Sequence, residues 1–218
     1  MLFDLDGTLI DSVYQHVLGW HEALLDFGVD LPVWRIHRRI GMSGGLFVAA
    51  LARETTLEID ESAAVVLGAG HAAAFERLRD SIRPLPGAER LLGVLTAMGV
   101  PWAIATSGNR RSAEPALDLL GVPDAVLVTR DEVRHAKPDP DLFLAAAARL
   151  GADPGQCLVV GDSVWDLLAA RRAGSLGIGL LSGGYGQEEL ERAGAYRVYE
   201  DPADLLDHLD EVGLRPAR

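Results

Sequence analysis

Two aspartates, Asp4 and Asp6, follow the short apolar run that opens this 218-residue chain. They precede Gly7 and Thr8, so a turn at the glycine can aim both carboxylates at one small volume. Together with Asp162, which ends a later apolar run, they offer the oxygen ligands that a hard cation such as Mg²⁺ prefers. A bound cation would cancel the repulsion between an attacking carboxylate and an anionic phosphoryl group. The spacing therefore predicts a magnesium-dependent site for phosphoryl transfer.

In such a site Asp4 can attack phosphorus and form an aspartyl-phosphate. Asp6 is then free to protonate the leaving oxygen and later to accept a proton from the hydrolytic water. The Lys137 ammonium and the Thr106 hydroxyl can stabilise charge on the phosphoryl oxygens, where phosphoryl transfer needs it. Three residues after Thr106 share its loop and are expected to bind substrate: Ser107, Gly108 and Asn109.

Elements of a parallel sheet are needed to bring these loops together. Short apolar runs ending in small or polar residues recur along the chain, at residues 1–5, 102–105, 125–128, 157–160 and 176–181. Between the later runs lie stretches with apolar residues at helical spacing. This alternation predicts an α/β fold with a doubly wound parallel sheet, whose ligand site lies at the carboxyl ends of the strands. The alternative for Asp4-Leu5-Asp6-Gly7-Thr8 alone is a solvated turn, which the ordered recurrence of Thr106, Lys137 and Asp162 after apolar runs argues against.

The interval between the first two runs is far longer than a crossover needs. Residues 13–80 have helical patterns, and a proline-containing stretch at 81–87 favours an extended return path. We therefore expect an α/β phosphotransfer core at 1–12 and 82–218 and an inserted helical cap at 13–81 that selects the substrate.

These motifs resemble those of a known family. Asp4-Leu5-Asp6-Gly7-Thr8-Leu9, Thr106, Lys137-Pro138 and Gly161-Asp162 with Asp166 are similar to the four successive motifs of the haloacid dehalogenase superfamily. The insert is similar to the helical cap of its phosphoglycolate phosphatase and β-phosphoglucomutase branch. The resemblance implies that Asp4 is nucleophile and metal ligand and that Asp6 is acid/base and a ligand through its main-chain carbonyl. It also implies that Asp162 is a metal ligand and that Asp166 supports the metal directly or through water.

Four residues of the insert are expected to contact substrate. His16 stands where the resembling β-phosphoglucomutases carry a hinge histidine, although an ordinary, partly buried histidine is the alternative. Arg39 precedes a glycine-rich turn and could reach a substrate carboxylate or phosphate, or lie on a solvated surface. Gly41 and Ser43 belong to the turn itself.

The same turn favours hydrolysis over phosphomutase activity. The resembling mutases hold the sugar phosphate with a lysine before the cap-turn glycine and an arginine after its serine. Here those places are taken by Ile40 and Gly44, so the predicted activity is that of a phosphatase, and a β-phosphoglucomutase-like enzyme is the alternative. Because Asp6 is present, whereas haloacid dehalogenases lack it, we expect no activity on 2-haloacids.

Two other classes of function stay open. Residues 41–45 fit the Gly-x-Ser-x-Gly pattern of serine hydrolases, with Ser43 as nucleophile, but that pattern requires a preceding strand and residues 34–39 lie in the helical insert. A phosphate-binding regulator that keeps the site without turnover is the non-enzymatic alternative.

Composition limits the partners. The formal net charge of −12 repels nucleic acid and anionic membrane surfaces, which leaves a small phosphorylated metabolite as the expected partner. No apolar run is long enough to span a membrane and the start lacks a signal peptide, so we expect a cytoplasmic monomer or homodimer. The single cysteine, Cys157, lies in an apolar run and is expected to be buried and inert. Nothing in the sequence identifies the metabolite.

Overall fold

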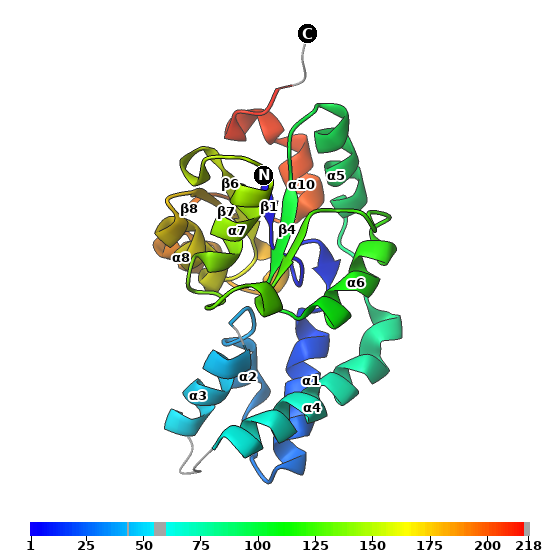
Figure 1. The fold of residues 1–218 in the computed structure, drawn as a ribbon, viewed down its shortest axis with the longest axis vertical. Helices are drawn as coiled ribbons and strands as arrows, with labels where there is room; N and C mark the ends of the chain where they lie inside the picture. The colour runs from blue at the N-terminus through cyan, green and yellow to red at the C-terminus, as the bar shows by residue number, and fades with distance from the viewer. Residues whose placement is uncertain (43, 55–59, 216–218) are drawn as a thin grey trace. The chain divides into compact units, whose positions relative to one another are not determined.

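The computed structural model describes residues 1–42, 44–54 and 60–215. The chain divides into two compact units (Figure 1), one made of Met1–Asp11 with Arg83–Arg218 and the other of Ser12–Ile82. The two segments that connect the units pair with each other as a short antiparallel ribbon, formed by β2 (Ile10–Asp11) and β3 (Arg83–Pro84). No helix in the described part of the chain is long and apolar enough to cross a membrane.

The first unit is built on a six-stranded parallel sheet with strand order β5-β4-β1-β6-β7-β8. Its strands are β1 (Leu2–Phe3), β4 (Ala103–Thr106), β5 (Leu127–Thr129), β6 (Leu158–Gly161), β7 (Leu176–Leu180) and β8 (Ala195–Tyr199). The first five coincide with the apolar runs. Four of them, β4, β1, β6 and β7, are central strands, which a parallel sheet buries on both faces. β5 lies at an edge, but its three residues are also buried. β8, at the opposite edge, has no such run, because Tyr196 and Arg197 in its middle are exposed.

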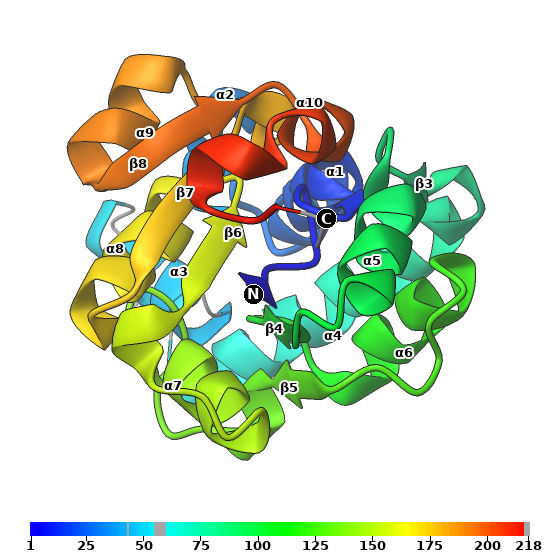
Figure 2. The same cartoon turned by 90° about the horizontal axis from the view of Figure 1, so that it is seen from above.

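Helices cover both faces of this sheet, as the predicted doubly wound α/β fold requires. They are α5 (Ala88–Ala97), α6 (Arg110–Leu119), α7 (Asp141–Arg149), α8 (Val164–Ala173), α9 (Gln187–Ala193) and α10 (Pro202–Asp207). Figure 2 shows α7 and α8 on one face and α5, α6 and α10 on the other. Short 3₁₀ turns connect several elements: η2 (Arg130–Glu132), η3 (Pro154–Gln156), η4 (Leu181–Gly183) and η5 (Leu209–Val212). Cys157 is buried in the core between sheet and helices, and burial raises the pKa of its thiol.

The second unit is helical. It contains α1 (Val13–Asp26), α2 (Val33–His37), α3 (Gly44–Glu54), α4 (Glu61–Leu78) and the turn η1 (Arg79–Ser81). Its own apolar core gathers side chains from all four α-helices, among them Val17, Trp20, Ile36, Phe47 and Leu67. Because this core is complete within the segment, the insert is a compact unit and not an extended loop.

Candidate active site

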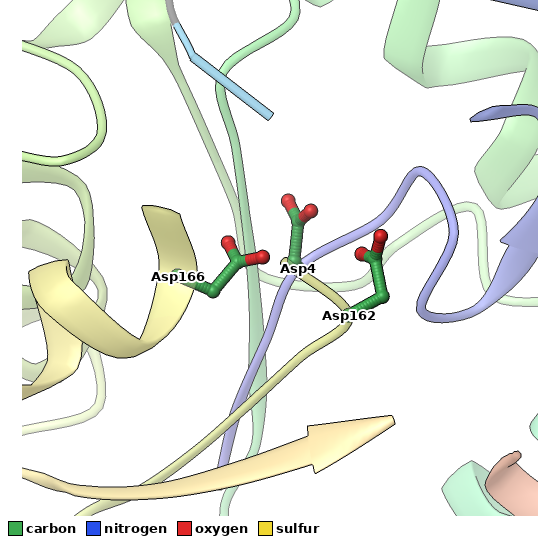
Figure 3. Close-up of side chains that lie close together, drawn as sticks. All are labelled: Asp4, Asp162 and Asp166. Carbon is green, nitrogen blue, oxygen red and sulfur yellow. The ribbon is translucent and has the colours of Figure 1, made fainter. Parts of the chain in front are cut away.

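Loops from the carboxyl ends of neighbouring strands carry the predicted catalytic side chains. Asp4 follows β1 and Asp162 follows β6, which pairs with β1. Asp166 lies in the first turn of α8, which begins at Val164, two residues after Asp162. Parallel strands end at the same edge of the sheet, so the three side chains meet there. Figure 3 shows Asp4 between the other two carboxylates.

These three aspartates could hold a metal ion. One carboxylate oxygen from each of Asp4, Asp162 and Asp166 can be chosen so that all lie within 4.8 Å of one another. All three residues are buried, with at most 4% of their surface exposed. A buried set of oxygen donors suits a hard cation such as Mg²⁺. The carboxylate of Asp6 is not part of this cluster. Metal binding by the main-chain carbonyl of Asp6 stays a prediction.

Lys137 is the positive partner of the cluster. Its side chain is fully buried and its ammonium pairs with Asp4 and, at 2.8 Å, with Asp166 Oδ1. Burial works against the charged form, but attraction to Asp166 and Asp4 outweighs it and raises the pKa of Lys137 above its ordinary value. Lys137 is therefore a cation that faces the predicted nucleophile.

The negative charges of the carboxylates, in contrast, exceed the single positive charge of Lys137. Burial is the main cause that raises the pKa of Asp4 to about 7; Lys137 opposes this change, and the charges of Asp166 and Asp6 add to it. Burial also raises the pKa of Asp162 well above its ordinary value, and the neighbouring charges of Asp166 and Asp4 contribute in the same direction. One lysine does not balance this group of acids, so a divalent cation bound among them would relieve their repulsion.

Hydrogen bonds orient the side chains of Asp162 and Asp166. Thr8 Oγ1 donates a hydrogen bond of 2.9 Å to Asp162 Oδ1. Asp166 Oδ2 accepts from the backbone N–H of Ser163 at 3.0 Å and from the Ser163 hydroxyl, an N-terminal capping arrangement of α8. A Cβ on Gly161 would lie 2.2 Å from Asp166 Cβ, so only glycine leaves space for this carboxylate.

The last residue of β4, Thr106, places a hydroxyl beside the second aspartate of the first motif, and the loop after β4 begins at Ser107. Thr106 Oγ1 lies 3.5 Å from Asp6 Oδ2 and accepts a 3.0 Å hydrogen bond from the Gly108 N–H. Asn109 caps α6, because its side-chain oxygen accepts from the N–H of Ser112 at 2.9 Å. Ser107 is half-buried in the same loop. Substrate binding by Ser107, Gly108 and Asn109 stays a prediction.

A sequence model of the haloacid dehalogenase-like hydrolase family matches residues 1–174, which contain every motif described above. The chain belongs to this family. The resemblance predicted from the four motifs is thereby confirmed, and the protein is a hydrolase of this family.

Individual relatives of this hydrolase support the assignment. A solved structure of a hydrolase from Pseudomonas syringae has a TM-score of 0.94 and 55% sequence identity, with 97% of each chain covered. Hexitol phosphatase A of Escherichia coli is 34% identical over 182 residues, which cover 79% of this chain and 78% of the relative. Phosphoglycolate phosphatase of Rhodospirillum rubrum is 31% identical over 234 aligned residues, covering 100% of this chain and 96% of the relative.

Within the helical unit of the hydrolase, His16 has a partner that the sequence did not indicate. His16 Nδ1 lies 3.1 Å from His71 Nε2, and the His16 ring stacks on Phe75 with centroids 4.0 Å apart. The Arg39 guanidinium donates to the carbonyl of Arg35 in α2. Gly41 has a φ of 93°, a conformation that favours glycine. Roles of His16, Arg39 and Gly41 in substrate binding stay predictions.

The serine-hydrolase alternative finds no support in the elements around it. Ser43 itself lies outside the described residues. Before it comes α2, which spans Val33–His37, followed by turns. A nucleophile elbow needs a strand at this place.

Two positioning residues of the hydrolase were missed by sequence reasoning. Thr8 was noted only as part of the first motif, and its bond to Asp162 joins residues 154 positions apart. Ser163 carried a usable signal, because a serine three residues before an acid at the start of a helix is a capping pattern.

Proposed function

We propose that this hydrolase is a magnesium-dependent phosphatase that cleaves a small phosphorylated metabolite through an aspartyl-phosphate on Asp4. The observation that carries the proposal is the buried cluster of Asp4, Asp162 and Asp166 with the Lys137 ammonium against Asp4. In this proposal the Asp4 carboxylate is the nucleophile, the Lys137 ammonium lies against it, and the three carboxylates hold the metal ion. Relatives named hexitol phosphatase A and phosphoglycolate phosphatase support the same class of reaction.

In the first step an oxygen of Asp4 attacks phosphorus, and the bond between phosphorus and the ester oxygen breaks. Asp6 gives its proton to the departing oxygen, which leaves as an alcohol. Lys137 stabilises the negative charge on the phosphoryl group, and the Thr106 hydroxyl, beside Asp6, orients it. Mg²⁺ held by Asp4, Asp162 and Asp166 would neutralise charge on the transferring phosphoryl group.

In the second step water attacks the aspartyl-phosphate. Asp6 takes a proton from this water, and the bond between phosphorus and Asp4 breaks. Inorganic phosphate leaves and the Asp4 carboxylate is regenerated, so Asp6 ends protonated as it began. Each residue thus returns to its starting state after one turnover.

The direct test is hydrolysis of p-nitrophenyl phosphate by the purified protein. We expect turnover with MgCl₂, loss of turnover after EDTA and recovery when magnesium is returned. Asp4→Asn should lower kcat at least about a thousandfold, because the amide cannot act as the nucleophile. Full activity after exhaustive chelation, or a phosphoryl group trapped on a residue other than Asp4, would contradict the mechanism.

A phosphomutase is the second candidate, because the insert resembles that of β-phosphoglucomutases. Ile40 and Gly44 replace the charged clamp of those enzymes, which supports release of the phosphoryl group to water. Incubation of β-glucose 1-phosphate with a catalytic amount of glucose 1,6-bisphosphate separates the two. Free phosphate supports the phosphatase, whereas accumulating glucose 6-phosphate would establish the mutase.

The metabolite itself is best found with a panel of phosphate esters. Hexitol phosphates and phosphoglycolate come first, since relatives carry those names. Residues of the helical unit, Ser12–Ile82, are proposed to select among them. The proposed assembly is a monomer or homodimer, which light scattering would decide.

A further inference from the structure

A fifth loop borders the aspartate cluster, although the sequence analysis gave it no role. This loop, residues 181–186, follows β7 and begins with the turn η4; we call it the β7 loop. β7 pairs with β6, and Gly179 of β7 is the partner of Gly161 at the end of β6. The β7 loop and the loop that carries Asp162 therefore leave adjacent strands at the same edge of the sheet.

The backbone of Gly183 lies against the carboxylate of Asp162. A Cβ on Gly183 would be 1.9 Å from Asp162 Oδ2 and 2.7 Å from Asp162 Cβ, whereas real Cβ atoms essentially never come closer than 3.0 Å to another heavy atom. Both residues are buried. The other oxygen of the same carboxylate, Oδ1, accepts the hydrogen bond from Thr8. Asp162 is thus confined between the Thr8 hydroxyl and the Gly183 backbone.

The preceding residue, Ser182, reaches a second loop of the site. Ser182 Oγ donates a 2.6 Å hydrogen bond to the carbonyl oxygen of Gly7. Gly7 has a φ of 80°, and its N–H donates to the Ile10 carbonyl at 2.8 Å, so it forms the turn directly after Asp6. Adjacent residues of the β7 loop therefore contact the turn that follows the predicted acid/base and the carboxylate of a predicted metal ligand.

We propose that Ser182 and Gly183 are positioning residues that set the metal affinity of the site. The inference rests on the proposed function, since it concerns the same cluster. Ser182 and Gly183 act through Gly7 and Asp162 and not on the reacting atoms. Partners that orient a metal ligand typically change metal affinity by about 10–100-fold when they are altered. Replacing Gly183 should weaken metal binding, because any side chain at this position would displace the Asp162 carboxylate.

The test compares two identical substitutions in one loop. Gly183→Ala places a methyl group where Asp162 lies. Gly186→Ala is the matched control, because its Cβ would meet only Glu189 Oε2, at an ordinary 3.5 Å, and its φ is −76°. Mn²⁺ binding to the purified protein, followed by electron paramagnetic resonance, measures affinity without turnover. We expect Gly183→Ala to bind Mn²⁺ about 10–100-fold more weakly and Gly186→Ala to bind it as the wild type does.

A second pair of variants addresses Ser182 and covers the case in which Gly183→Ala does not fold. Ser182→Ala removes the hydrogen bond to Gly7 and should weaken Mn²⁺ binding several-fold, about 3–10-fold, below the range for Gly183→Ala. Ser182→Thr keeps the hydroxyl and should restore wild-type affinity. In activity assays the loss of activity in Gly183→Ala and Ser182→Ala should become smaller at saturating Mg²⁺. These substitutions lower the metal affinity and leave the nucleophile in place.

The outcomes separate this inference from the proposed function. Wild-type Mn²⁺ affinity in both Gly183→Ala and Ser182→Ala would overturn the inference and leave a metal-dependent phosphatase in place. Weaker Mn²⁺ binding in these variants, with no phosphatase activity in the wild type on any ester tested, would support the inference and refute the proposed function. A loss of affinity equal in Gly186→Ala and Gly183→Ala would also count against the inference.

Discussion

Lys137 is the residue whose burial demands an explanation. A fully buried ammonium is costly unless it is paired, and Lys137 has both Asp4 and Asp166 as partners. Its ammonium also lies over the ring of Phe143, 5.1 Å from the ring centroid. The charge is thus matched on one side by the predicted nucleophile and on the other by the aspartate at the start of α8.

We expect Lys137→Met to lower the free energy of unfolding by about 3–5 kcal/mol, because it leaves two buried carboxylates without their cation. The control is Arg192→Met. The ion pair of Arg192 with Glu188 is about 80% exposed on both sides and should contribute less than about 1 kcal/mol. Urea denaturation of both variants in EDTA measures the difference. Equal effects of the two substitutions would contradict the role of Lys137 as the compensating charge.

At the scale of elements, the Glu132 carboxylate in the turn η2 links β5, α6 and α7. Glu132 accepts from the Thr129 N–H at 3.0 Å and from the Thr129 hydroxyl at 3.1 Å, at the end of β5. It also pairs with Arg110 of α6 at 3.1 Å and with Arg149 of α7. Burial opposes its charge, but the hydrogen bonds from Arg149 and Thr129 outweigh this and lower the pKa of Glu132 to about 2.

This pKa has a defined consequence for stability. Relative to the ordinary value of 4.5, the stabilisation by Glu132 is complete above pH 4.5 and is lost as the pH falls toward 2. Because the side chain is 23% exposed and its arginine partners more so, the contribution is about 1–2 kcal/mol, below what the shift alone implies. Glu132→Gln should therefore destabilise by that amount at pH 7 and by less at pH 3.5. Urea denaturation at both pH values measures this; a deficit that grows in acid would contradict it.

In the helical unit, α1 and α4 pack closely because small residues face each other. A Cβ on Gly70 would lie 3.1 Å from the Cβ of Ala23, whereas a Cβ on Gly68, two residues earlier in α4, would meet nothing within 4 Å. A larger side chain at Gly70 must therefore push the helices apart.

The two glycines of α4 should respond to leucine in opposite directions. Gly70→Leu is expected to destabilise by about 1–3 kcal/mol through overpacking. Gly68→Leu should stabilise by up to about 1 kcal/mol, because leucine favours a helix more than glycine does. Differences in the free energy of unfolding from urea denaturation decide the matter, and a gain in stability for Gly70→Leu would show that the contact with Ala23 is not restrictive.

At the scale of the whole molecule, the net charge of −12 and the acidic cluster act together. An anionic surface repels an anionic substrate at long range, so attraction must come from the site itself. Its cation, Lys137, is already engaged by two aspartates, so under the proposed function a metal ion would supply most of the positive charge that attracts a phosphate ester.

Metal binding should consequently stabilise the unit that holds the aspartate cluster, Met1–Asp11 with Arg83–Arg218. At a Mg²⁺ concentration 100 times the Kd, binding to the native state adds about 2.7 kcal/mol. For a chain of this size that corresponds to a rise in Tm of roughly 5–10 °C. Thermal denaturation with increasing MgCl₂ measures the shift. NaCl at matched ionic strength is the control, since screening of the net charge also stabilises; an equal shift with NaCl, or an undiminished one in Asp162→Asn, would contradict specific binding.

The sequence by itself determined the architecture and the order of the motifs. Buried parallel strands leave continuous apolar runs, and polar residues that follow such runs must share one edge of the sheet. This reasoning predicted that Asp4, Thr106 and Asp162 share one edge of the sheet, and they stand at the carboxyl ends of the neighbouring parallel strands β1, β4 and β6. It did not find β8, because Tyr196 and Arg197 of this strand are exposed and no continuous apolar run marks it.

Only the tertiary structure decided which side chains touch. Lys137 lies between Asp4 and Asp166, and Gly183 confines Asp162, through contacts that depend on side-chain direction within adjacent loops. The pairing of His16 with His71 depends in the same way on how α1 packs against α4. Sequence periodicity assigns a residue to a face or an edge, but register, helix rotation and rotamer fix distances of a few ångströms, and these are set by packing of the whole unit.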